Sequence, residues 1–269
     1  MKIIDTQVSS ERGTKIPLSI VEPDLFPAKL LICAHGFKAK RTEDGRFLTV
    51  AEALAKDGVL SIMMGFPGCD ESKEDFLSYT LENCLSDIGS CVDYVKKRYE
   101  LKSDTGMIGY SMGGRLTALY IQRHPEISCI GLWAAAAYDA FNGEDAFLGM
   151  DLAKMKAQIK EKGYVDFYNG FDDSWIRLNG ALIRESEGLP VEKGLKEFAG
   201  SALVVHGDED VTVPYQVALN SYADLEKAKD RKLVRVNGAD HGFGQWNGRP
   251  DLSRELTDAT IEYFRKHFV

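Results

Sequence analysis

This 269-residue sequence lacks several features that define other protein classes. No apolar run approaches the roughly 20 residues that a membrane-spanning helix needs. The opening segment, MKIIDTQVSSERG, has no apolar stretch typical of a signal-peptide core. Internal repeats and low-complexity tracts are absent, and the 44% hydrophobic and 28% charged shares are ordinary for a globular chain. We therefore expect a soluble, cytoplasmic protein with no membrane partner, rather than a fibrous or disordered chain.

Basic charge and paired cysteines are also scarce. With 33 Lys and Arg against 41 Asp and Glu, the formal net charge of −8 argues against a phosphate-binding surface, so we expect no nucleic-acid partner. The five cysteines are odd in number and scattered, without a CxxC pair, which argues against a zinc site and a redox dithiol. We expect reduced thiols in the core.

Short apolar strands alternate with amphipathic helices along most of the chain. The N-terminal segments Lys2–Val8 and Lys15–Val21 predict a β-hairpin. Further strands are predicted over Lys29–Ala34, Val59–Met64, Gly106–Tyr110, Ile127–Ala135, Ser201–Val205 and Lys232–Val236, and helices over Phe47–Lys56, Leu81–Tyr99, Met112–Arg123, Tyr215–Lys227 and Leu252–Phe268. Because such alternation produces right-handed βαβ crossovers, it predicts an α/β protein with a mostly parallel central sheet flanked by helices.

The alternation pauses over residues 138–195. This stretch is rich in aromatic residues and has helical spacing in places, notably over Met150–Lys160. A structureless loop of this length is rare inside a compact domain. We therefore predict an inserted lid or cap at 138–195, on a core formed by residues 1–137 and 196–269.

The pentapeptide Gly109-Tyr110-Ser111-Met112-Gly113 lies where a predicted strand ends and a helix begins. Small flanking residues in that context allow a sharp turn that exposes the serine hydroxyl at the helix N-terminus, where developing negative charge is favoured. The pattern predicts Ser111 as a nucleophile. The alternative is a glycine-rich loop with an incidental serine.

A serine nucleophile needs a base, and His241 is the best candidate. It lies in a loop after the last predicted strand, at the same end of the sheet as Ser111. A histidine on the surface is the alternative. The other four histidines fit structural roles: strand ends, where a buried and hydrogen-bonded imidazole is expected, for His35 and His206, and helix ends, near carbonyls or solvent, for His124 and His267.

The third member of such a triad is an acid that orients the imidazole. We favour Asp210, in the loop after the strand that ends at His206-Gly207, with Asp208 as the second choice. Asp240 is expected to point away from its neighbour His241. The alternative is that this acidic run forms only a solvated loop.

The order Ser, Asp, His along the chain is that of the α/β-hydrolases. The sequence resembles this superfamily over nearly its whole length, and it is similar to the compact esterase branch that includes cinnamoyl and feruloyl esterases. The motifs that carry the resemblance are His35-Gly36-Phe37, Gly109-Tyr110-Ser111-Met112-Gly113, His206-Gly207-Asp208-Glu209-Asp210 and Asp240-His241-Gly242-Phe243.

The resemblance implies an α/β-hydrolase fold and an oxyanion hole formed by the backbone N–H groups of Phe37 and Met112. One position departs from the pattern, because similar proteins usually have an aspartate or another polar residue where Gly65 stands. We expect this change to affect local support rather than the triad.

Four aromatic residues of the insertion are candidates for the substrate pocket: Tyr138, Phe141, Phe171 and Trp175. Alternatively, they pack the lid onto the core. Lys38 and Arg41 follow the oxyanion turn, where they either attract a carboxylated substrate or are solvated charges, the second being favoured.

The sequence thus predicts a serine hydrolase that cleaves carboxylic esters of small or medium acyl groups, aromatic groups included. An amidase of the serine aminopeptidase type or a thioesterase would use the same triad, and a non-enzymatic ligand-binding module is a third reading. We expect no metal and no organic cofactor. The expected partner is a small-molecule ester, and the expected assembly is a monomer or homodimer.

Overall fold

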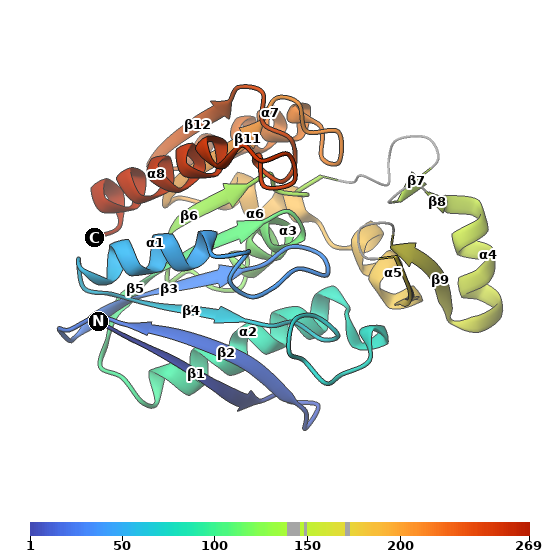
Figure 1. Ribbon diagram of the computed structural model, residues 1–269, viewed down its shortest axis with the longest axis horizontal. Helices are drawn as coiled ribbons and strands as arrows, with labels where there is room; N and C mark the ends of the chain where they lie inside the picture. Colours follow the sequence, from blue (N-terminus) through green and yellow to red (C-terminus); the bar gives the residue numbers. More distant parts are fainter. Residues whose placement is uncertain (139–145, 148–149, 170–172) are drawn as a thin grey trace.

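The structure is a computed structural model that describes residues 1–138, 146–147, 150–169 and 173–269. Within them, the main sheet has eight strands, arranged in the order β1, β2, β4, β3, β5, β6, β11, β12 (Figure 1). Their bounds are β1 Lys2–Ser9, β2 Lys15–Glu22, β3 Ala28–Ala34, β4 Val59–Met64, β5 Leu101–Tyr110, β6 Ile127–Trp133, β11 Ser201–Gly207 and β12 Asp230–Val236.

Strand pairing gives this sheet a mostly parallel character. The predicted N-terminal hairpin is confirmed, since β1 and β2 pair antiparallel from Lys2 opposite Glu22 to Ser9 opposite Lys15. Strand β2 is also antiparallel to β4, and every pair from β4 to β12 is parallel. The predicted mostly parallel central sheet is confirmed.

Helices cover both faces of the sheet, and the alternation of strand side chains decides which face each residue meets. On one face lie α1 (Arg46–Ala55) and α8 (Pro250–His267), which pack on residues such as Cys33 and Trp133. The other face, which includes Ile32 and Leu132, is covered by α2 (Leu81–Lys96), α3 (Met112–Tyr120) and α7 (Tyr215–Asp224). All five cysteines are buried and free, as expected.

Several element boundaries differ from the prediction. Strand β5 begins at Leu101 rather than at the predicted Gly106. The prediction missed this part of the strand because Lys102–Asp104 are exposed and lack an apolar pattern. Helix α3 ends at Tyr120 rather than Arg123. Residues 121–123 form a turn instead, before His124, which is disfavoured in the helical conformation because it precedes Pro125.

The insertion contains more β-structure than its sequence indicated. Helix α4 (Leu152–Lys162) matches the predicted helix, with Asp151 as N-cap and Gly163 as C-cap. Strands β9 (Tyr164–Asn169) and β10 (Ser174–Asn179) then form an antiparallel hairpin that was not predicted. Short strands β7 (Ala146–Phe147) and β8 (Met150–Asp151) pair with each other, and helices α5 (Gly180–Gly188) and α6 (Val191–Glu197) lead back to β11.

The insertion stands beyond the carboxyl ends of the parallel strands, at the side toward which the arrowheads of β3, β4 and β5 point (Figure 1). Its last helix, α6, packs against α3 of the core. The division at residues 138–195 stays a prediction. Among the described residues, no helix has both the length and the apolar character required to cross a bilayer.

Helix α8 provides a test of the core. Phe264 is fully buried, and glycines in β5 and β6 leave room for its ring: a Cβ at Gly106 would lie 3.2 Å from Phe264. We expect Phe264→Ala to lower the free energy of unfolding by about 3–5 kcal/mol, measured by urea denaturation, because the cavity cannot be refilled. The control Leu219→Ala, at a residue 40% exposed on α7, should cost less than about 1 kcal/mol. Equal losses for the two variants would contradict this packing.

Candidate active site

Ser111 occupies a sharp turn between β5 and α3. Its backbone has φ 53° and ψ −116°, a conformation that L-residues rarely adopt. Neighbouring glycines make the turn possible, since a Cβ at Gly113 would lie 1.9 Å from Ala34 O. The Ser111 peptide is held on both sides: its N–H donates to Trp133 O (2.9 Å), and its carbonyl oxygen accepts from Ala136 N–H (2.9 Å). The turn presents the hydroxyl at the carboxyl edge of the sheet.

His241 and Asp210 complete a hydrogen-bonded chain with this hydroxyl. His241 Nε2 lies 3.0 Å from Ser111 Oγ, and His241 Nδ1 lies 2.7 Å from Asp210 Oδ2. The loops after β11 and β12 supply the acid and the histidine. Because a carboxylate only accepts, Nδ1 carries the proton and Nε2 is left to accept from the serine hydroxyl. This is the tautomer that a general base requires.

Asp210 is buried and is held by three further groups. Its Oδ1 accepts from the N–H groups of Thr212 (2.9 Å) and Val213 (2.8 Å). His206 Nε2 lies 3.2 Å from Asp210 Oδ2 and also donates to Val213 O (2.8 Å), so this histidine is buried and hydrogen-bonded, as predicted. Burial raises the pKa of Asp210, but hydrogen bonds from His206 and His241 outweigh that effect and lower the pKa to about 2.

The other two acids near this loop have different partners. Asp208 Oδ2 accepts from Arg235 Nη2 (2.6 Å) and its Oδ1 from Gly238 N–H (2.6 Å), so it ties the loop to the end of β12. Asp240 Oδ1 accepts from Gly244 N–H (2.9 Å). The structure therefore brings Asp210, rather than Asp208 or Asp240, to His241.

The predicted oxyanion donors flank Ser111. The turn His35–Phe37 follows β3 and passes so close to the serine that a Cβ at Gly36 would lie 3.3 Å from Ser111 Cβ. Met112 begins α3, and N–H groups in a first helical turn have no intrahelical acceptor. A role for these two N–H groups in an oxyanion hole stays a prediction.

The chain is similar to a known protein family over most of its length. Residues 46–268 match the sequence pattern of the prolyl oligopeptidase family. The chain belongs to this family. This family match supports a serine hydrolase.

Solved structures similar to this member of the prolyl oligopeptidase family include esterases. Est1E from Butyrivibrio proteoclasticus with ferulic acid bound is 23% identical, with 97% of this chain and 99% of that chain covered and a TM-score of 0.78. The esterase domain of a Rhodothermus marinus protein is 18% identical over 99% of both chains, with a TM-score of 0.71. The esterase EaEST from Exiguobacterium antarcticum is 18% identical over 96% of this chain and 100% of that chain, with a TM-score of 0.65. The resemblance to the α/β-hydrolase superfamily is confirmed.

The expectation that Arg41 is a solvated charge is wrong. Arg41 is buried and forms an ion pair with Asp70, and its Nε donates to Ser19 Oγ (2.7 Å). Asp70 also explains the departure at Gly65, because a Cβ at Gly65 would lie 3.6 Å from Asp70 Oδ2. A polar side chain from five residues further along the chain therefore lies beside the position where similar proteins have one.

Lys38 and the candidate pocket residues show how the insertion meets the core. Lys38 Nζ donates to Ser174 Oγ in β10 (2.7 Å). Tyr138 O–H donates to Asp224 of α7, a contact that attaches the insertion to the core, and Trp175 is 70% exposed. Phe141 and Phe171 lie outside the described residues. A role for these four aromatic residues in binding substrate stays a prediction.

The site also includes residues that the sequence did not single out. Phe167 of β9 faces Phe37, with ring centroids 6.4 Å apart. Glu43 and Arg46 form a buried ion pair beside the oxyanion turn. Their signal in the sequence is weak, because charges three residues apart at the start of a helix are usually solvated.

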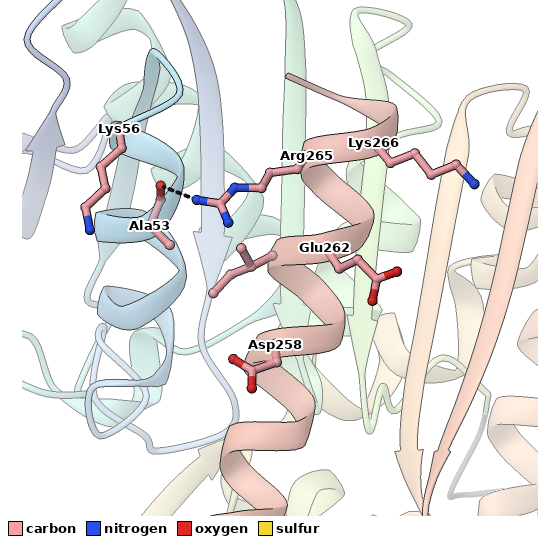
Figure 2. A pocket seen from close by; sticks show the side chains of 7 residues that line it. Ala53, Lys56, Asp258, Glu262, Arg265 and Lys266 are labelled. Carbon is pink, nitrogen blue, oxygen red and sulfur yellow. Dashed lines mark hydrogen bonds between the residues drawn. The ribbon is translucent and has the colours of Figure 1, made fainter.

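A hollow lies between α1 and α8 (Figure 2). It is lined by Ala53, Lys56, Asp258, Ile261, Glu262, Arg265 and Lys266. The end of α1 leads directly into the start of β4, whereas Ser111 follows the carboxyl end of β5. Because β4 and β5 run parallel to β3 between them, the hollow and the triad lie at opposite ends of the strands.

Among the described residues, no group of three His, Cys, Asp or Glu side chains is arranged to hold a metal ion.

The lowered pKa of Asp210 makes stability depend on pH. A carboxyl group whose pKa is lower in the folded than in the unfolded chain stabilises the fold above its ordinary pKa, and this contribution is lost as the pH falls toward the folded value of about 2. We expect the stability advantage of the wild type over Asp210→Asn to shrink by about 1 kcal/mol between about pH 5 and pH 3, measured by urea unfolding. The exposed control Asp258→Asn should follow the wild type throughout. If the difference in free energy of unfolding between wild type and Asp210→Asn stays constant over this pH range, the lowered pKa of Asp210 is refuted.

Proposed function

We propose that the protein hydrolyses carboxylic esters of small or medium acyl groups, aromatic groups included, through an acyl-enzyme intermediate on Ser111. The observation that carries this proposal is the unbroken chain from Ser111 Oγ through His241 to Asp210 Oδ2, with distances of 3.0 and 2.7 Å. Hydrogen-bond contact between a hydroxyl, an imidazole and a buried carboxylate is the arrangement that activates a serine.

In the proposed cycle, His241 Nε2 takes the hydroxyl proton as Ser111 Oγ attacks the carbonyl carbon. Asp210 stabilises the imidazolium that forms. The N–H groups of Phe37 and Met112 bind the oxyanion, and each such donor contributes about 3 kcal/mol to transition-state stabilisation. His241 then gives the proton to the leaving alcohol. A water molecule, deprotonated by His241, releases the acid and restores Ser111.

Two observations support a preference for substrates with aromatic acyl groups. Est1E from Butyrivibrio proteoclasticus, which shares the fold over 97% of this chain, has been solved with ferulic acid bound. In this chain, Phe37 of the oxyanion turn makes edge contacts with Phe76, Tyr79 and Phe167. Phe37, the partly exposed ring of this cluster, would favour planar acyl groups, since offset and edge-to-face ring contacts contribute about 0.5–1.5 kcal/mol each.

Amide hydrolysis is the second candidate, and the match to the prolyl oligopeptidase family favours it. The same triad serves both reactions, since both pass through an acyl-enzyme. Esters and amides with the same acyl group separate them: similar values of kcat/KM for both would support a peptidase-like or amidase activity.

Ser111 is the nucleophile of the proposed reaction. Wild-type protein is expected to gain a single fluorophosphonate adduct, detected by intact mass, and to hydrolyse aryl and alkyl esters. Ser111→Ala should lose both the adduct and the hydrolysis, because no activated hydroxyl remains. An adduct that persists in Ser111→Ala would place the nucleophile elsewhere. If folded wild-type protein gives no adduct and no turnover, the ligand-binding module becomes the better reading.

Asp210 is the acid of the proposed triad. Asp210→Asn should lower kcat for the best ester by about 10³–10⁴-fold, because an amide at this position no longer fixes the required tautomer of His241. Asp208→Asn is the matched control in the same loop, and its kcat should stay within about tenfold of wild type, since Asp208 contacts Arg235 instead. A larger loss from Asp208→Asn would reverse the assignment.

A further inference from the structure

Glu43 and Arg46 form an ion pair in the interior, outside the triad. Arg46 Nη2 lies 3.1 Å from Glu43 Oε2, and the two side chains are only 8% and 2% exposed. Removing two such charges from water costs several kcal/mol, and a buried pair often contributes no net stability. Its remaining hydrogen bonds show what the pair does instead.

The carboxylate of Glu43 holds the oxyanion turn. Gly36 N–H donates to Glu43 Oε1 at 2.6 Å, a short charge-assisted bond in the buried interior. Glu43 itself has φ 48°, an unfavourable backbone conformation for a non-glycine residue. This strained turn directs the Glu43 side chain back to Gly36, which lies seven residues earlier in the chain, just after the end of β3.

The next peptide of the turn is fixed by His35. Phe66 N–H donates to His35 Nε2 (3.0 Å), so the ring proton resides on Nδ1, which donates to Gly36 O (2.7 Å). Burial lowers the pKa of His35 to about 4, which keeps the ring neutral. In a trans peptide the N–H points opposite to the carbonyl, so the bond to Gly36 O also sets the direction of the Phe37 N–H.

The guanidinium of Arg46 holds the histidine loop. Its Nη1 donates to Gly242 O (3.0 Å), the carbonyl next to His241. It also lies over the ring of Tyr110, 4.7 Å from the centroid, and Tyr110 O–H donates to His241 O (2.8 Å). A planar guanidinium can make these contacts together with its bonds to Glu43, whereas the point charge of lysine cannot.

We propose that the Glu43–Arg46 pair is a positioning device that fixes the oxyanion turn relative to Ser111 and His241. This one ion pair contacts three segments: the turn at Gly36, next to the proposed oxyanion donor; Tyr110, the residue before Ser111; and Gly242, the residue after His241. The inference rests on the proposed function, because its effect on turnover requires that the triad is catalytic. Neither residue contacts the reacting atoms in this role.

The test uses Glu43→Gln and Arg46→Lys, with Asp87→Asn as the matched control. Asp87 is also a buried carboxylate, paired with Arg12 at 2.8 Å, but it lies on α2 away from the triad. Both site variants should lower kcat for an aryl ester by about 10–100-fold with KM changed less than about threefold, because misplaced donors weaken mainly transition-state binding. Asp87→Asn should leave kcat within about twofold, even where it lowers stability as much.

Hydrogen–deuterium exchange provides a readout that does not require turnover. Both site variants should speed exchange in peptides covering residues 35–37 and 240–243, and Asp87→Asn should not. If wild-type protein neither labels with fluorophosphonate nor hydrolyses esters, the proposed function fails, and exchange still reports on the pair. Unchanged exchange in both site variants, or a kcat within twofold of wild type in both, overturns the inference. A variant that does not fold is replaced by Arg46→Gln, scored in the same way.

Discussion

The backbone conformation of Ser111 is the constraint on which the site depends. A residue with φ 53° and ψ −116° costs about 1–3 kcal/mol and persists only where the surroundings determine it. Here the bonds to Trp133 and Ala136 hold the peptide, and the closeness of Gly113 to Ala34 draws α3 against the end of β3. The same closeness brings the turn that follows β3 to the serine. The same close contacts therefore hold Ser111, the turn after β3 and the N-terminus of α3 together.

Buried charges then fix the loops around that turn. Asp210 accepts two backbone N–H groups of its own loop, Glu43 accepts the N–H of Gly36, and Arg46 donates to the carbonyl of Gly242. Loops at a sheet edge have few apolar neighbours that could hold them, so charge-assisted bonds to the backbone provide the rigidity. Desolvation of these groups costs stability, but it leaves donors and acceptors that would not need to reorganise in the proposed reaction.

The insertion is joined to this edge at the oxyanion turn itself. Phe37 contacts Phe167 of β9, and Lys38, directly after the turn, donates to Ser174 of β10, so two consecutive residues meet both strands of the hairpin. Apolar residues of the insertion, including Val165 and Leu182, also extend the core cluster on the α2 and α3 face. The insertion is therefore continuous with the core that positions Ser111.

The sequence by itself determined the fold class and the order of Ser111, Asp210 and His241. Strand and helix periodicities are local, and parallel strands gather the loops after their carboxyl ends at one edge. It did not determine the burial of Arg41, the hairpin β9–β10 or the pairing of Glu43 with Arg46. Gly242, which Arg46 holds, is 196 residues further along the chain. Such contacts arise only when distant segments pack together, because burial and hydrogen-bond partners depend on the surrounding fold rather than on neighbouring residues.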